Sequence, residues 1–223
     1  MQKLYTQAST TAGTTVSTKE TSKVLRSTYA LLAMTFTFSA FAALMAMVFK
    51  MPPMNPLLML VPYFILLWLT EKNKNSAMGL VWVFALTGWL GLSIGPLVGH
   101  VSSTVGFEPI LMSLGGTAII FFGLSGYVLT TRKDLSFMSG FLMTGLLVGF
   151  VAVIANLFLQ IQGLSLAISC MFLLLSSGII AWYTSVIIHG GETNYISATV
   201  MLFVAIYNIF ISLLSLFVNF GND

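Results

Sequence analysis

The chain has 223 residues, of which 57% are hydrophobic and 7% are charged. Soluble domains carry roughly 25% charged residues, so this composition excludes an ordinary soluble protein and predicts an all-α integral membrane protein. The formal net charge of +3 is too small to indicate a nucleic-acid partner. The single cysteine, Cys170, excludes a disulfide within the chain, and His100 and His189 have no metal-site spacing. We therefore expect neither a metal nor another cofactor.

Seven apolar runs follow one another along the chain, separated by short segments rich in polar residues, proline or glycine. Because lipid offers no hydrogen-bond partners, each run must satisfy its own backbone as a helix. The strands of a β-barrel would alternate apolar and polar residues, whereas these runs are continuously apolar. The sequence therefore predicts a bundle of seven transmembrane helices. We expect them at residues 27–49, 54–70, 77–99, 107–130, 137–159, 164–188 and 193–219.

Lysine and arginine are distributed unevenly between the segments that connect these runs. If the N-terminus is cytoplasmic, eight of the nine basic residues lie on the cytoplasmic side and only Lys50 lies outside. The positive-inside rule thus predicts a cytoplasmic N-terminus and a periplasmic C-terminus. Ser17 and Glu20 have the spacing of a capping box, which predicts a helix that begins before the first span. The predicted parts are a flexible cytoplasmic tail at 1–26, a transmembrane domain at 27–219 and a short end at 220–223.

No ionisable side chain lies deep within a predicted span. The six carboxylates all fall in the tail, the loops, the edges of spans or the C-terminus. An ionised residue at the bilayer centre costs at least about 2.5–3.5 kcal/mol, and chains keep one there mainly for transport or proton relay. This absence disfavours a carboxylate-lined ion path but leaves a neutral polar path open. Because the H-E-x-x-H, G-x-S-x-G and P-loop motifs are also absent, we predict a protein that is not an enzyme.

Neutral polar residues do occur within the predicted spans. In the seventh span they recur at helical spacing and share a face with Ala205. Such residues should face the interior of the bundle rather than lipid. They serve either as hydrogen-bonding groups between helices or as the lining of a polar cavity or ion path. The candidate interior stripe comprises Asn156, Thr184, Asn194, Ser197, Asn208 and Ser212.

Glycines form a second pattern in the predicted spans. Gly91, Gly95 and Gly99 are spaced by four residues, and so are Gly145 and Gly149. Small residues at this spacing let two helix backbones approach closely. We expect these ridges to pack helices of the same chain, with docking of a partner's helix as the alternative.

Charged residues and a histidine on the predicted cytoplasmic face are candidates for contact with a cytoplasmic partner. They lie in the tail, in the loop after the fourth span and in the loop after the sixth. The alternative is that they anchor helix ends at the membrane surface. The candidate contacts are Lys19, Lys23, Arg26, Arg132, Lys133, Asp134, His189 and Glu192.

Several segments together resemble the Bax-inhibitor (transmembrane Bax-inhibitor motif) family. The carriers are VLRSTYALL at 24–32, TTRKDLSF at 130–137 and YNIF at 207–210. Their order and the plan of seven spans extend the resemblance over about residues 24–219. Two further segments, GGTA at 115–118 and HGGETNYI at 189–196, are similar to a bacterial inner-membrane branch of the family.

The resemblance implies two different functions. The bacterial branch implies a modulator of the membrane-anchored protease FtsH, which is both its substrate and its competitive inhibitor and uses the N-terminal tail as a degradation handle. The calcium-leak branch implies a cation leak gated by an aspartate pair on the last two helices. Matching of the motifs places that pair at Tyr183 and Ala205, neither of which is a carboxylate. We therefore expect the protease modulator, with a calcium or other cation leak as the alternative.

Overall fold

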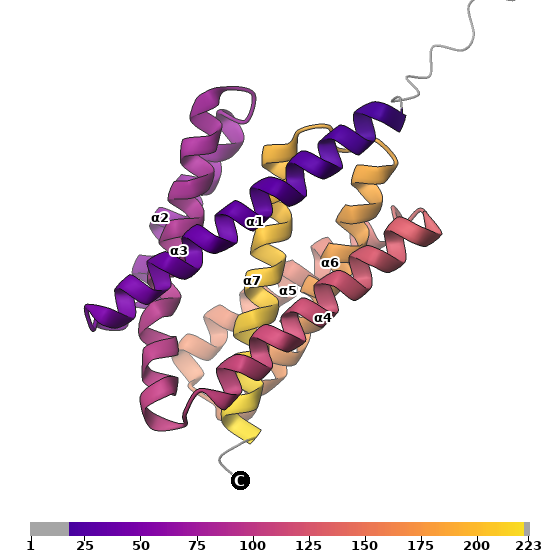
Figure 1. Ribbon diagram of the computed structural model, residues 1–223. Coiled ribbons are helices and arrows are strands. Elements are labelled where there is room, and N and C mark those ends of the chain that lie inside the picture. The colour runs from indigo at the N-terminus through magenta and orange to yellow at the C-terminus, as the bar shows by residue number, and fades with distance from the viewer. Residues whose placement is uncertain (1–17, 221–223) are drawn as a thin grey trace, which may run out of the picture.

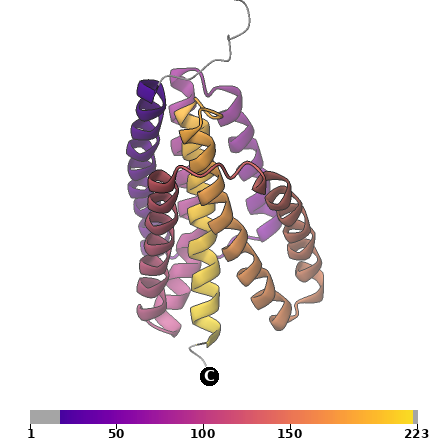
Figure 2. The same ribbon diagram turned by 90° about the vertical axis from the view of Figure 1, so that its right-hand side faces the viewer.

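The computed structural model describes residues 18–220, and this part of the chain is built from seven helices joined by short loops. Successive helices run in opposite directions, so α1 begins at one end of the bundle and α7 ends at the other (Figures 1 and 2). We call the end at which α1 begins the N-terminal end; the α2–α3, α4–α5 and α6–α7 loops also lie there. The helices are α1 Thr18–Val48, α2 Pro56–Lys72, α3 Ala77–Thr104, α4 Glu108–Thr131, α5 Met138–Leu159, α6 Gln162–Ile188 and α7 Tyr195–Phe220.

Six of these helices are long and apolar enough to cross a membrane. The remaining one, α2, has 17 residues and rises about 25 Å, somewhat less than the roughly 30 Å of a hydrocarbon core. The helix α6 is continuous over 27 residues and is one of the six. An all-α bundle of apolar helices is therefore confirmed.

Two boundaries differ substantially from the prediction. The helix α1 begins at Thr18, so residues 18–26 are helical rather than part of a flexible tail. This agrees with the capping-box prediction, although Ser17 itself lies outside the described residues. The helix α3 continues to Thr104 and includes His100, which the sequence placed in a loop. No proline stops α3 there, and its serine and threonine hydroxyls bond to carbonyls of the preceding turn.

The helix α7 lies at the centre of the bundle and contacts every described helix except α5. Its central position is compatible with its sequence, because the helix contains no charged residue that would have to face water. Phe203, Leu202, Ile209 and Leu214 are almost completely buried. The core therefore forms around α7.

A close contact between α1 and α3 depends on three glycines of α3. A Cβ atom at Gly91 would lie 2.2 Å from the Ser39 carbonyl oxygen, and one at Gly95 would lie 2.6 Å from the Ala43 carbonyl oxygen. A Cβ atom at Gly88 would lie 2.7 Å from the Phe38 ring. Two members of the predicted ridge, Gly91 and Gly95, thus lie against the α1 backbone, whereas a Cβ atom at the third, Gly99, would make only an ordinary contact of 3.5 Å with Met47. Gly88 was not part of the predicted ridge.

The helix α5 stands at the edge of the bundle and packs against α6 alone (Figure 2). Gly145 and Gly149 face α6, where added Cβ atoms would lie 2.4 Å from Leu175 and 2.9 Å from Phe172. The outer side of α5 exposes large apolar side chains such as Phe141 and Phe158. Such a surface is suited to lipid.

Candidate functional site

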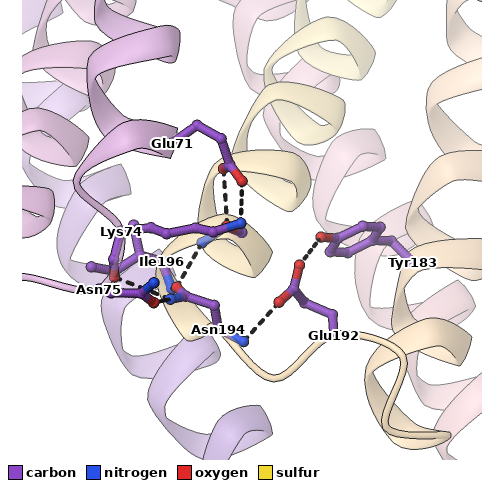
Figure 3. A network of polar contacts seen from close by, with 8 residues as sticks. Glu71, Lys74, Asn75, Tyr183, Glu192, Asn194 and Ile196 are labelled. Atoms are coloured by element: carbon purple, nitrogen blue, oxygen red, sulfur yellow. Dashed lines mark hydrogen bonds and ion pairs between the residues drawn. The ribbon is translucent and has the colours of Figure 1, made fainter.

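A network of polar contacts joins α2, α6 and α7 at the N-terminal end of the bundle (Figure 3). Glu71, in the last turn of α2, forms an ion pair with Lys74 through Oε1. Its Oε2 accepts a hydrogen bond of 3.0 Å from the Ser197 hydroxyl of α7. The hydrogen bond to Glu71 raises the pKa of the Lys74 ammonium above its ordinary value of 10.5, so this lysine stays charged at neutral pH.

Glu192, in the α6–α7 loop, is held by two neutral donors. The Tyr183 hydroxyl donates to Oε2 at 2.8 Å, and the Asn194 backbone N–H donates to Oε1 at 2.7 Å (Figure 3). Glu192 forms no ion pair with any residue that the structure describes. The Lys74 ammonium, which forms an ion pair with Glu71, also interacts electrostatically with Glu192, so the two carboxylates share one cation at this end of the bundle.

Asn194 connects the start of α7 to the α2–α3 loop. Its Oδ1 accepts hydrogen bonds from the backbone N–H groups of Ile196 and Ser197, at 2.9 and 3.3 Å, and so caps the helix. Its Nδ2 donates to the Lys74 carbonyl at 3.1 Å and to Asn75 Oδ1 at 2.8 Å. One side chain therefore fixes both the start of α7 and the neighbouring loop.

A groove of about 680 Å³ lies next to this network. Residues of α2 and α5 line its two sides, and residues of α6 and α7 form most of its base. It opens laterally because α2 and α5 do not contact each other. Glu71 and Glu192 line it at the N-terminal end, whereas Met59, Phe172 and Ile211 line it farther along the bundle. We call this cavity the lateral groove.

Two polar side chains lie along the lateral groove without a partner. Asn208 of α7 and Tyr63 of α2 both line it. Neither side chain forms a hydrogen bond with a residue in the described part of the chain, whereas the neighbouring Tyr207 hydroxyl donates to the Leu90 carbonyl at 3.2 Å. Polar groups at this depth in a bilayer normally find partners on neighbouring helices. The lateral groove thus offers unused hydrogen-bonding groups on apolar walls.

The two positions matched to the family's aspartate pair line this same groove. Tyr183 lies on its α6 side and binds Glu192, while Ala205 lies on α7 and is 2% exposed. Sequence matching therefore located a real cavity. The carboxylates that line it come instead from Glu71 and Glu192.

The predicted interior stripe is only partly correct. Ser197, Thr184 and Ser212 are buried, and the Thr184 hydroxyl has no hydrogen-bond partner in the described structure. Asn156 does not belong to the stripe, because it lies at the end of the peripheral α5, where its Oδ1 accepts from the Ile161 N–H at 3.2 Å. Asn194 precedes α7 rather than lying within it, since it is the capping residue.

The predicted partner-contact residues gather at the N-terminal end but do not form one cluster. All of those with described side chains are exposed except Glu192, which is half-buried in the network. The Lys19 side chain lies outside the described residues. The exposed members are Lys23, Arg26, Arg132, Lys133, Asp134 and His189.

The α4–α5 loop is fastened to α6 by Ser185. The Ser185 hydroxyl donates to the Lys133 carbonyl at 2.9 Å and accepts from the Leu135 N–H at 3.1 Å. One turn later, His189 Nδ1 lies 2.8 Å from the Ser185 carbonyl oxygen. The charged loop therefore has a defined position on the bundle.

The Asp134 carboxyl of this loop is expected to titrate below its ordinary pKa. Hydrogen bonds from the Ser136 side chain and backbone lower the pKa of Asp134 from 3.8. Its contribution to stability is therefore complete above pH 3.8 and is lost as the pH falls through the lower, folded value. NMR of the labelled carboxyl carbon should show Ser136→Ala raising the titration midpoint, while Thr131→Ala leaves it unchanged. An unchanged midpoint in Ser136→Ala would contradict this assignment.

Within the described residues, no group of three or more histidine, cysteine or acidic side chains is arranged to hold a metal ion. The polar network can bind a cation through its two carboxylates or a hydrogen-bonding partner through the lateral groove.

Comparison with known proteins assigns this chain to a family. Residues 21–222 match the family model described as inhibitor of apoptosis-promoting Bax1. The chain belongs to the Bax-inhibitor family.

The modulator of FtsH protease YccA of Escherichia coli K12 is 51% identical over 196 residues, which cover 88% of this chain and 90% of that protein. The protein PA2604 of Pseudomonas aeruginosa is 50% identical over 206 residues, covering 92% and 93% of the two chains. A membrane protein of Vibrio cholerae is 43% identical over 201 residues, covering 89% and 90%.

Sequence analysis named some residues of the polar network and the lateral groove and missed others. Glu192 was named from its unusual glycine-containing loop. Glu71, Lys74 and Tyr63 were not named, because nothing local distinguishes them from residues that anchor a helix end. The α2–α3 loop comes close to the start of α7 only through folding, because Lys74 and Asn194 are 120 positions apart in the sequence.

Proposed function

We propose that this chain is a multi-pass inner-membrane protein that binds and modulates a membrane-anchored ATP-dependent protease of the FtsH type. The observation that carries the proposal is the 51% identity to YccA over 88% of the chain. The family match at residues 21–222 includes the helices that form the polar network and the lateral groove. The protein is not an enzyme, so modulation must come from binding.

The proposed topology has all seven helices crossing the membrane, with the N-terminal end in the cytoplasm and the C-terminus in the periplasm. The positive-inside distribution supports this orientation. The alternating direction of the seven helices supports crossing by α2 as well, because α1 and α3 both run away from the N-terminal end and α2 connects them in the opposite direction (Figure 1). Its length of 17 residues needs only a small local adjustment of the bilayer.

The proposed mechanism has two parts. Residues 1–16, which lie outside the described structure, serve as the handle that enters the protease; a chain of 16 residues reaches at most roughly 55 Å. Because α1 packs closely on α3 and α7 lies at the centre, the bundle then resists extraction. A protease occupied in this way degrades other substrates more slowly.

Deletion of residues 2–16 tests the handle. We expect the half-life of the chain in cells that contain the protease to rise several-fold, and protection of a second membrane substrate to be lost. The matched control replaces the segment with a shuffled sequence of the same composition, which should retain both effects. Unchanged turnover and unchanged protection in the deletion variant would contradict the proposed mechanism.

The alternative function is a cation leak. The lateral groove favours it in one respect, since two carboxylates, Tyr183 and Asn208 line a single cavity. Beyond Asn208, however, its walls are apolar residues such as Ile211 and Phe172, which would present a barrier to a hydrated ion. Calcium flux from loaded vesicles that is abolished by Asn208→Leu would favour the leak over the protease modulator.

A further inference from the structure

The lateral groove has the dimensions of a seat for part of a helix. Along α2 it extends from Met59 to Glu71, a rise of about 18 Å at 1.5 Å per residue. This corresponds to roughly half the length of a transmembrane helix. Its open side lies between α2 and α5, which do not touch, so a helix can enter it from the bilayer.

Polar side chains line the groove at two levels along its length. Midway along α7, the Asn208 carboxamide lines the groove and forms no side-chain hydrogen bond within the described residues. At the N-terminal end, Glu71 and Glu192 line the same groove, and the two carboxylates share a single described cation, Lys74, whose ion pair is with Glu71. An occupant that fits both levels has a hydrogen-bonding side chain near its middle and a positive charge about 17 Å away along its axis, because Asn208 lies eleven residues beyond Ser197, which binds Glu71.

We propose that the lateral groove binds one transmembrane helix of a partner protein, which presents a polar side chain to Asn208 and a lysine or arginine to Glu71 and Glu192. The inference rests on the proposed function, which places the acidic end in the cytoplasm and supplies a membrane-anchored partner. Transmembrane helices carry their basic residues mainly at the cytoplasmic end. The charge of the groove is therefore complementary to a helix inserted in the usual way.

A lipid fits the groove less well. An acyl chain has no donor or acceptor to pair with Asn208, and the phosphate of a headgroup would lie against the two carboxylates. A second groove, of about 700 Å³ between α1 and α4, is lined by no charged residue. The charged and hydrogen-bonding groups thus distinguish the lateral groove as a surface for a protein helix.

Photocrosslinking in a defined system tests the contact. The full chain carries a photoreactive amino acid at Met201, which lines the groove, or at Ile119, which is 75% exposed on α4 and lines neither groove. Each protein is reconstituted with purified FtsH-type protease in vesicles of phosphatidylethanolamine and phosphatidylglycerol. We expect a crosslink to a transmembrane segment of the protease from Met201 and only lipid adducts from Ile119. Lipid adducts alone at both positions would overturn the inference.

Binding measurements on variants provide the second arm. Met201→Trp, which narrows the groove, should weaken binding of the protease about tenfold, and Asn208→Leu should weaken it roughly threefold or more. The control Ile119→Trp should bind like the parent chain. Thermal unfolding of each variant in detergent separates loss of the fold from loss of binding.

The outcomes distinguish this inference from the proposed function. If the parent chain binds and modulates the protease but the groove variants do so equally well, the groove inference is wrong and the proposed function stands. If the parent chain itself neither binds nor modulates the protease, the proposed function fails first.

Discussion

Replacement of Gly91 with alanine is expected to lower the free energy of unfolding by about 1–3 kcal/mol, the usual cost of forcing an extra carbon into a packed interior. The added Cβ would lie 2.2 Å from the Ser39 carbonyl oxygen. The nearest atom and the carbon bonded to it belong to the Ser39 backbone, so no side-chain rotation relieves the clash and α1 must move away from α3. Reversible unfolding in mixed micelles, followed by circular dichroism, measures the change.

The matched control is Gly115→Ala. Gly115 also lies inside a helix, but a Cβ there would meet nothing within 4 Å. Alanine is the better helix former by about 0.5–1 kcal/mol, so this variant should be as stable as the parent or slightly more so. If the two alanine variants change stability in the same direction, close packing of α1 on α3 does not control the fold. The proposed resistance to extraction would then lose its structural basis.

Replacement of Asn194 with alanine is expected to lower the free energy of unfolding by about 2.5–4 kcal/mol. The helix cap contributes roughly 0.5–2 kcal/mol, and each of the two hydrogen bonds from Nδ2 contributes about 1 kcal/mol. The physical reason is that this side chain both caps α7 and holds Lys74 and Asn75 of the α2–α3 loop. Hydrogen exchange at the start of α7 should increase together with the loss of global stability.

Asn194→Asp separates the two roles of this residue. Aspartate retains the oxygen that caps α7 but has no donor for the α2–α3 loop, so a loss about half as large is expected. The control, Thr193→Ala, changes an exposed neighbour in the same loop and should have little effect. Equal losses in Asn194→Ala and Thr193→Ala would show that the connection to the α2–α3 loop is unimportant.

These two variants also bear on the lateral groove. Asn194 holds the loop that carries Lys74, the ion-pair partner of Glu71, and its backbone N–H binds Glu192. A weakened network should therefore alter the acidic end of the groove before it alters the apolar walls. Binding of the protease to Asn194→Asp provides a direct comparison with Asn208→Leu, which acts in the groove far from its acidic end.

The candidate site was only partly predictable. The loop at 189–196 was noticeable in the sequence because a histidine, two glycines and a glutamate interrupt an almost uncharged chain. Asn208 could be named because it recurs with Ser197 on one face of a helix. Asn156 has the same chemistry and was assigned wrongly, since nothing in its local sequence reveals that α5 lies at the edge of the bundle.

By itself, the sequence determined that this protein consists of seven apolar helices and that the interior of the bundle carries almost no charge. These properties are local, because the backbone of each segment must satisfy its hydrogen bonds without help from lipid. The family could also be identified from short motifs. The spacing of Ser17 and Glu20 also indicated that α1 begins before the first predicted span.

Only the tertiary structure decided which helices touch and which stay apart. In a bilayer, apolar side chains gain little by leaving lipid for one another, so close packing at glycines and a few polar contacts select the arrangement. Gly91 brings α3 against α1, and Asn194 brings the start of α7 against the α2–α3 loop. The gap between α2 and α5 follows from that selection. Hydrophobicity alone does not predict this gap, because every apolar helix face is equally stable in contact with lipid.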